Sequence, residues 1–139
     1  MTARASQGRL TGVDPASLDP SVLDFLTERH LATLTTLRRD GSPHVVPVGF
    51  GYSPVDHRVR IITFDGSQKV RNAERGGRAA VSQVDGGRWL TLEGEVRVVR
   101  DADRVAQAVA AYAARYQEPK QRIDRVAIEI DVDRVLGRA

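Results

Sequence analysis

The sequence contains no cysteine, and this absence excludes disulfide bonds, thiolate metal ligands and cysteine nucleophiles. The lack of cysteine is consistent with a reducing compartment, and we expect a cytoplasmic protein. No apolar run approaches the roughly 18 residues that a membrane-spanning helix requires, so we expect no membrane span. Residues 1–18 are polar and lack the apolar stretch of a signal peptide. We expect them to form a disordered tail that precedes a single domain at residues 19–139.

Lysine is scarce as well, since Lys69 and Lys120 are the only two lysines among 21 basic residues. The net charge is +3, but the arginines are interleaved with acidic residues and form no block. Nucleic-acid-binding proteins usually concentrate their positive charge on one face, so we expect no nucleic-acid partner. A local basic patch for a small anionic ligand remains compatible with this pattern.

Several signatures of catalytic chemistry are missing. The three histidines, His30, His44 and His57, do not have the spacing of metal ligands on one element, so we expect no metal site. The sequence has no nucleophile elbow, no glycine-rich dinucleotide fingerprint and no Walker loop. Glu93 and Glu95 share a strand face, where solvated charges are more common than an acid–base pair. An enzyme of this kind would therefore depend on a cofactor.

The elements that are present indicate a mainly β domain. Apolar alternation and turn residues predict six strands and three helices. Hairpin turns such as Asp40-Gly41 and Gly86-Gly87 join most neighbouring strands, which favours a small antiparallel barrel with flanking helices over a doubly wound sheet. The predicted strands are 31–38, 43–50, 58–64, 78–85, 88–100 and 125–132, and the predicted helices are 20–29, 68–75 and 102–118.

Two residues inside the predicted strands interrupt regular pairing. Pro47 has no amide hydrogen, so it marks a sheet edge, a bulge or an opening where a ligand can reach the backbone. Gly94 predicts a bulge or a sharp bend within the long strand 88–100.

The segment Thr63 to Glu74 has the composition of an anion site. It follows a predicted strand, turns at Asp65-Gly66 and enters a helix that Ser67 can cap. Free amide groups and partial positive charge at a helix start attract anions, and Lys69 and Asn72 lie on one helical face. A cradle for one phosphate group and an ordinary capped surface helix both fit this segment.

Four segments, taken in order, carry a family resemblance. They are DGSPHVVPVGF (40–50), RIIT (60–63), SQKVRN (67–72) and WLTLEGE (89–95). Together they resemble the pyridoxamine 5'-phosphate oxidase-like split β-barrel family over residues 20–137. More narrowly, they resemble its flavin/deazaflavin oxidoreductases that use coenzyme F420, and within those the F420-dependent biliverdin reductase type. The resemblance implies an FMN-binding-like, six-stranded antiparallel split barrel that forms a homodimer, with the cofactor in a groove between the subunits.

The resemblance also implies which residues bind the cofactor, and it implies no dedicated catalytic residue. The phosphate would be held at the helix start, by Ser67, Lys69, Val70 and Asn72. Two strands would line the ring through backbone and apolar contacts, with Val46, Pro47, Val48, Ile61, Ile62 and Thr63. Contacts to the ring or to the partner subunit would come from Ser82, Gln83 and Trp89. For Trp89, a place in the barrel or dimer core is an equal alternative.

The implied activity is hydride transfer from reduced F420 to a conjugated small-molecule acceptor, with biliverdin as one candidate. An FMN-dependent oxidoreductase and a non-catalytic cofactor- or tetrapyrrole-binding protein remain alternatives. F420 also carries a lactyl and oligoglutamate tail that needs further positive charge. The candidate partners of this tail are Arg38, Arg39, Arg71, Arg75 and Arg78.

Overall fold

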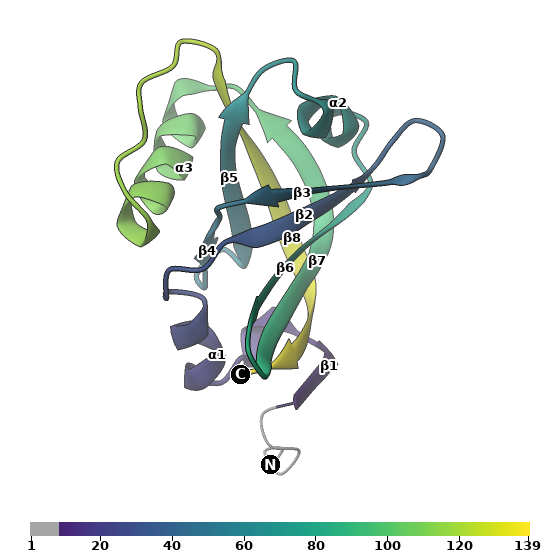
Figure 1. Ribbon diagram of the computed structural model, residues 1–139, viewed down its shortest axis with the longest axis vertical. Helices are drawn as coiled ribbons and strands as arrows, with labels where there is room; N and C mark the ends of the chain where they lie inside the picture. The colour runs from purple at the N-terminus through teal and green to yellow at the C-terminus, as the bar shows by residue number, and fades with distance from the viewer. Residues whose placement is uncertain (1–8) are drawn as a thin grey trace.

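Backbone hydrogen bonds join the strands into one antiparallel sheet, which the computed structural model describes over residues 9–139 (Figure 1). The strand order is β3-β2-β6-β7-β8-β5-β4, and β1 pairs with β8 beside this path. The strands are β1 (Arg9–Val13), β2 (Ala32–Leu37), β3 (Pro43–Val48), β4 (Gly51–Ser53), β5 (Arg58–Phe64), β6 (Arg78–Asp85), β7 (Arg88–Val99) and β8 (Arg125–Arg138). The helices are the 3-10 helix η1 (Pro15–Ser17), α1 (Pro20–Phe25), α2 (Gln68–Glu74) and α3 (Ala102–Arg115).

The sheet curls into a barrel with one open seam. Strand β3 pairs with β2 only, and its chain continues directly into β4, which pairs with β5 through Gly51–Arg60, Tyr52–Val59 and Ser53–Arg58. These three pairs close the barrel at one end of β5. Beyond Arg60, β5 pairs with β8 on one side, and its other edge has no strand partner among residues 9–139. The barrel is therefore split between the end of β3 and the end of β5.

Alternation along each strand fills the barrel with apolar side chains. Leu34, Ile61, Val81, Leu92 and Ile128 come from five strands and are essentially fully buried. The helices α1 and α2 lie near opposite ends of the sheet and bury Phe25 and Val70 in the same core, while α3 lies alongside β5 (Figure 1). No helix within residues 9–139 combines the length and the hydropathy that crossing a bilayer requires.

The mainly β antiparallel barrel is confirmed, but the sheet has eight strands rather than the predicted six. Strand β4 lies in a segment predicted to be a loop, and it is too short to show alternation. Strand β1 and η1 lie where we expected a disordered tail, so that prediction is wrong for residues 9–17; residues 1–8 lie outside the described residues. β1 gives little sequence signal because a glycine with positive φ and a register shift interrupt its pairing with β8.

Element ends differ from the predictions where side-chain bonds or close packing decide them. The helix predicted at residues 20–29 ends at Phe25, and Thr27 turns its hydroxyl back to the carbonyl oxygen of Asp24. β8 runs six residues beyond its predicted end and crosses β7 closely. The predicted bulge at Gly94 is confirmed by a register shift after Glu93. A Cβ on Gly94 would lie 1.8 Å from the carbonyl oxygen of Asp131, so only glycine permits this crossing.

Candidate ligand cleft in the open seam of the barrel

A cleft of about 440 Å³ occupies the open seam between β3 and β5. Its walls come from the ends of these two strands, from α2 and α3, from the segment between α3 and β8, and from the first residue of β8. The lining residues are Pro47, Val48, Gly49, Ile62, Thr63, Phe64, Lys69, Tyr112, Gln117, Pro119, Lys120, Arg122 and Arg125. The predicted cofactor residues Pro47, Val48, Ile62, Thr63 and Lys69 are thus brought together, although they lie on three separate elements.

The position of the cleft depends on how α3 holds the junction between β3 and β4. The Phe50 amide donates to the Tyr116 hydroxyl at 3.1 Å, and that hydroxyl donates to the carbonyl oxygen of His30 at 2.6 Å. The buried Arg115 guanidinium donates to the carbonyl oxygen of Phe50 at 2.8 Å. A Cβ on Gly49 would lie 3.0 Å from the rings of Tyr112 and Tyr116, so the junction packs directly on the helix.

The cleft is strongly basic. Lys69, Lys120, Arg122 and Arg125 line it, and no carboxylate among residues 9–139 does so. The two lysines of the chain therefore share one cleft. Arg122 is already paired with Asp124 at 2.8 Å. This excess of positive charge indicates an anionic ligand.

Lys69 is held close to an aromatic ring instead of a carboxylate. Its Nζ lies 5.5 Å from the centroid of the Phe64 ring, and the Arg122 guanidinium carbon lies 4.5 Å from the same centroid. Within the described part of the chain, Lys69 has no ion pair. Burial lowers the pKa of Lys69 from its ordinary value. An anion placed beside the amine would compensate for this loss of hydration.

Two buried polar atoms of residues that line the cleft have no hydrogen-bond partner within residues 9–139. These atoms are the Thr63 hydroxyl oxygen and the Arg125 Nε. Thr63 is only 8% exposed. Buried polar groups are almost always hydrogen-bonded in native proteins, so water or a ligand that carries acceptor atoms would satisfy these two atoms.

The start of α2 has the predicted local structure. Gly66 has φ of 86°, and the Ser67 hydroxyl accepts a hydrogen bond from the Val70 amide at 3.4 Å, so Ser67 is the predicted N-cap. Arg71 donates to the carbonyl oxygen of Gly66 at 2.5 Å and braces the turn. Lys69 extends from this capped turn into the cleft, which accounts for its position there.

Asn72 does not line the cleft. Its side chain is buried, and its Nδ2 donates to the Thr36 hydroxyl at 3.0 Å. Its Oδ1 accepts from Gln68 at 2.7 Å and from Arg75 at 3.2 Å. These bonds tie α2 to β2, so Asn72 positions the helix that carries Lys69.

The other predicted site residues lie in the core or on a different face. Ile61 and Val70 are fully buried in the core, and Val46 packs against it. Gln83 is buried near α1, where it donates to the carbonyl oxygen of Phe25 at 3.1 Å and accepts from Arg115 at 2.7 Å. Ser82 and Trp89 are on the outer face of β6 and β7, away from the cleft lining.

That outer face is an exposed apolar surface, which we call the open sheet face. The register places its residues on the same side of neighbouring strands, because Val84 lies opposite Trp89 and Thr35 lies opposite Val45. Five of the large exposed apolar side chains belong to it, namely Leu31, Leu37, Val45, Val84 and Trp89. An apolar patch of this kind on a sheet is typical of a protein–protein contact.

A second basic cavity lies on the outer side of α2. It has a volume of about 360 Å³ and is lined by Arg39, Gln68, Arg71, Glu74 and Arg75. Glu74 is paired with Arg100 at 2.6 Å, so its negative charge is already compensated outside the cavity lining. The five arginines that we considered as partners of the F420 tail do not all lie at this cavity. Three of the five arginines come together here, Arg38 braces the hairpin by donating to Pro43, and Arg78 pairs with Asp133 elsewhere.

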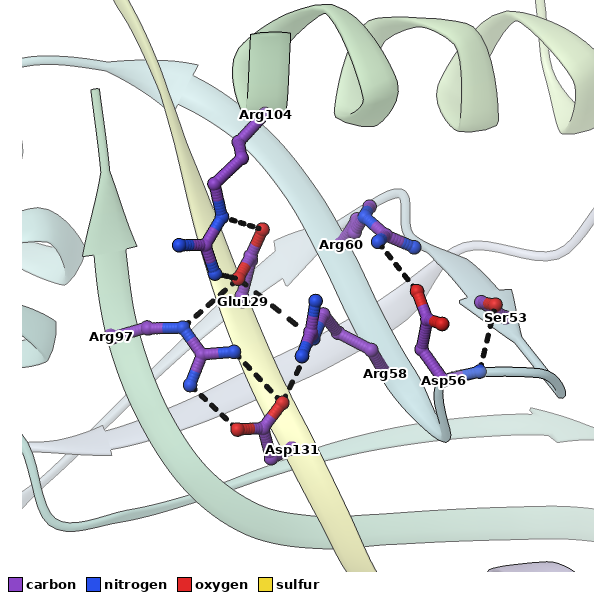
Figure 2. A network of polar contacts seen from close by, with 8 residues as sticks. All are labelled: Ser53, Asp56, Arg58, Arg60, Arg97, Arg104, Glu129 and Asp131. Carbon is purple, nitrogen blue, oxygen red and sulfur yellow. Dashed lines mark hydrogen bonds and ion pairs between the residues drawn. The ribbon is translucent and has the colours of Figure 1, made fainter. Parts of the chain in front are cut away.

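A network of arginines and carboxylates lies outside the cleft, where it fastens α3 to the sheet (Figure 2). Glu129 on β8 is fully buried and accepts hydrogen bonds from Arg97 at 3.0 Å and from Arg104 of α3. Asp131 accepts from Arg97 at 2.6 Å and from Arg58 at 2.9 Å, which lowers its pKa to about 2. Both the Glu129 and the Asp131 carboxylates are paired with arginines, so the network is structural.

One group of possible metal ligands comes together within residues 9–139. Glu28, His30 and Asp85 place ligand atoms within 4.8 Å of one another. Arg88 already bonds both carboxylates, at 2.9 Å to Glu28 and 2.6 Å to Asp85. A cation at this position would have to displace the guanidinium group.

Sequence reasoning missed the part of the cleft that is formed by α3, by the segment after it and by the start of β8. Tyr112, Gln117, Lys120, Arg122 and Arg125 line the cleft, but they match no motif. The only signal in the sequence was the scarcity of lysine, because a chain that otherwise uses arginine places both of its lysines here.

Comparison with known proteins identifies the family to which the chain belongs. The family model for pyridoxamine 5'-phosphate oxidase matches residues 18–139. The chain belongs to the pyridoxamine 5'-phosphate oxidase family. The resemblance identified from the sequence is therefore confirmed.

Relatives within the pyridoxamine 5'-phosphate oxidase family narrow the comparison. The chain is 55% identical over 122 residues to an F420H(2)-dependent biliverdin reductase of Mycobacterium tuberculosis, covering 88% of this chain and 89% of that protein. A solved F420 reductase is 26% identical with a TM-score of 0.67 and covers 81% of this chain and 93% of its own. A conserved hypothetical protein of Mycobacterium tuberculosis has a TM-score of 0.74 at 21% identity over 92% and 89% of the two chains, which shows the shared fold.

A cofactor with a flat ring and a phosphate fits the residues of this cleft. Among residues 9–139, Lys69 has no carboxylate partner, and the Thr63 hydroxyl and the Arg125 Nε have no hydrogen-bond partner. Pro47 and Ile62 offer apolar surface on the two strand ends that border the seam. The donor set therefore suits an anionic, oxygen-bearing group beside an apolar one.

Proposed function

We propose that this chain is a reductase that uses coenzyme F420, held in the cleft between β3 and β5. The proposal is carried by one observation, a basic cleft in a chain 55% identical to an F420H(2)-dependent biliverdin reductase. The solved F420 reductase of the same fold supports it further. Bound in its reduced form, F420 would supply a hydride to a conjugated acceptor, for which biliverdin is the first candidate.

The residues of the chain would position the cofactor and exclude water from it. Lys69 would pair with the phosphate, beside the turn that Ser67 caps. The free edges of β3 and β5, around Val48 and Thr63, would offer backbone groups and apolar surface to the ring. Asn72 would act through α2, by fixing the helix on β2. This differs from the direct phosphate contact expected from the sequence.

The remaining predicted contacts fit other roles. The cavity formed by Arg39, Arg71 and Arg75 would receive the carboxylates of the F420 tail. The open sheet face would form the homodimer contact, with Ser82 and Trp89 inside it. This apolar surface supports a homodimer. Measuring the mass of the protein in solution tests it, and the Trp89→Glu variant should have half the mass of the wild-type dimer. The cytoplasmic location stays a prediction.

Equilibrium titration with F420 and with FMN tests the proposed function. We expect micromolar affinity for F420, weaker affinity for FMN, and repeated turnover of biliverdin with reduced F420. Tight FMN binding with weak F420 binding would identify an FMN-dependent enzyme and would refute the proposal. Tight F420 binding without turnover of any conjugated acceptor would instead support a carrier.

A further inference from the structure

The segment at residues 117–124, between α3 and β8, borders the cleft, and we call it the strap (Figure 1). Four of its residues line the cleft, and all of its residues except Pro119 are exposed. Within residues 9–139, one backbone hydrogen bond joins it to a neighbouring segment, from the Asp65 amide to the carbonyl oxygen of Asp124 at 2.8 Å. A segment with so few bonds and so little burial can change its position at low cost.

A second hollow, of about 530 Å³, separates the strap from α3. Val105 and Val109 line it from α3, where they lie one turn apart and are half-buried. Ile123 lines it from the strap and is 108% exposed, the largest exposed fraction among the large apolar side chains of residues 9–139. A fully exposed isoleucine therefore lies beside an incompletely covered apolar helix face.

Two features of the strap favour its movement towards the domain. Burial of an exposed aliphatic side chain is favourable, and Ile123 shares its hollow with two half-buried valines. Lys120 lines the cleft from the strap and has no ion pair within the described part of the chain, so an anion in the cleft would attract it. Both hollows lie between the strap and the rest of the domain, so one inward movement would shrink both.

We propose that the strap closes over a ligand in the cleft and that Ile123 then packs against Val105 and Val109. The ligand-free structure is the open form. A ligand shifts the strap only if it binds the closed form more tightly, and Lys120 supplies that difference by approaching the negative charge. The inference rests on the proposed function for the identity of the ligand, F420.

The first test measures the effect of a side chain that contacts nothing in the open form. Ile123→Ala should weaken F420 binding about tenfold in a fluorescence titration, the scale for removing an aliphatic side chain from a buried contact. It should leave the ligand-free stability unchanged, because Ile123 is fully exposed there. Val55→Ala is the matched control, since Val55 is 88% exposed and lines neither hollow, and it should change neither quantity. Unchanged F420 affinity in Ile123→Ala would overturn the inference.

The second test traps the closed form without relying on affinity. The chain contains no cysteine, so Val109→Cys combined with Ile123→Cys provides the only two thiols. A disulfide requires Cβ atoms about 3.5–4.5 Å apart, and a fully exposed Ile123 has no such neighbour on α3 in the open form. We expect oxidised glutathione to form this disulfide slowly in the ligand-free protein and several-fold faster with F420. Adding Lys120→Gln should reduce the acceleration without preventing the disulfide.

The outcomes separate the strap from the cofactor. If the disulfide forms in neither condition, the strap does not close and the inference is overturned. If F420 binds but does not accelerate the disulfide, closure is independent of the ligand and the inference is also overturned. If F420 does not bind the wild-type protein, the proposed function is refuted, and a disulfide that still forms upholds closure of the strap onto α3.

Discussion

Replacing Lys69 by methionine should change stability and ligand affinity in opposite directions. The amine is partly buried against the Phe64 ring and has no carboxylate partner within residues 9–139, so the folded state loses hydration of the charge without recovering it. Methionine keeps the length and packs well against an aromatic ring. We expect the ligand-free Lys69→Met protein to be more stable by roughly 0.5–2 kcal/mol, the scale for relieving an incompletely paired polar group.

The affinity for a phosphate-bearing cofactor should fall in the same variant. A charge-assisted hydrogen bond is worth about 1.5–3 kcal/mol, which corresponds to a loss of about 13- to 160-fold in affinity. Fluorescence titration with F420 measures this loss, and denaturant unfolding in phosphate-free buffer measures the stability. Arg29→Met serves as the control, and we expect it to alter neither quantity appreciably.

The lowered pKa of Lys69 adds a pH signature to this test. Between its folded pKa and its ordinary value of 10.5, the unfolded chain binds a proton that the folded chain has lost. Stability from this group therefore rises with pH across that window, and Lys69→Met should lack the rise. If Lys69→Met is less stable than the wild type and binds F420 equally well, the assignment of Lys69 as an uncompensated anion ligand is refuted.

Three further predictions concern the scaffold around the cleft. Glu129→Gln should lower the free energy of unfolding in urea by about 3 kcal/mol, because it leaves Arg104 and its neighbours without their buried carboxylate. The control Glu95→Gln, at an exposed position, should lower it only slightly. Equal losses in the two variants would contradict the structural role of the network. Gly51→Ala should lower stability by about 1–3 kcal/mol because its Cβ would lie 2.7 Å from that of Ala111, and the double variant with Ala111→Gly should recover most of the loss. Burial raises the pKa of Tyr52 to about 12, so stability should fall as pH rises from 10 towards 12, and Tyr52→Phe should abolish this fall. A difference in phenolate absorbance between wild type and Tyr52→Phe that is complete by pH 10 would contradict the burial.

Much of the β architecture could be predicted from local pattern alone. The strands Arg58–Phe64 and Arg78–Asp85 were predicted with their observed bounds, since period-two alternation and flanking glycine turns define them locally. The Ser67 cap and the Gly94 bulge were also predicted, because each depends on the chemistry of one residue and its neighbours. Pro47 was predicted to mark an edge, a bulge or an opening, and β3 lies at the end of the strand order, which is an edge.

The cleft itself depended on contacts between distant segments. Asn72 and Gln83 have the same polar chemistry as ligand-binding amides, and only the packing of α2 on β2 and of Arg115 against β6 turns them into structural residues. Likewise, Lys69 and Lys120 are remote in the chain, and no local pattern connects them. They meet because the barrel stays open between β3 and β5 and the segment after α3 returns to that opening. Local sequence thus predicted six of the eight strands and the cap of the helix that carries Lys69, whereas the long-range closure of the sheet decided which other basic side chains share its cleft.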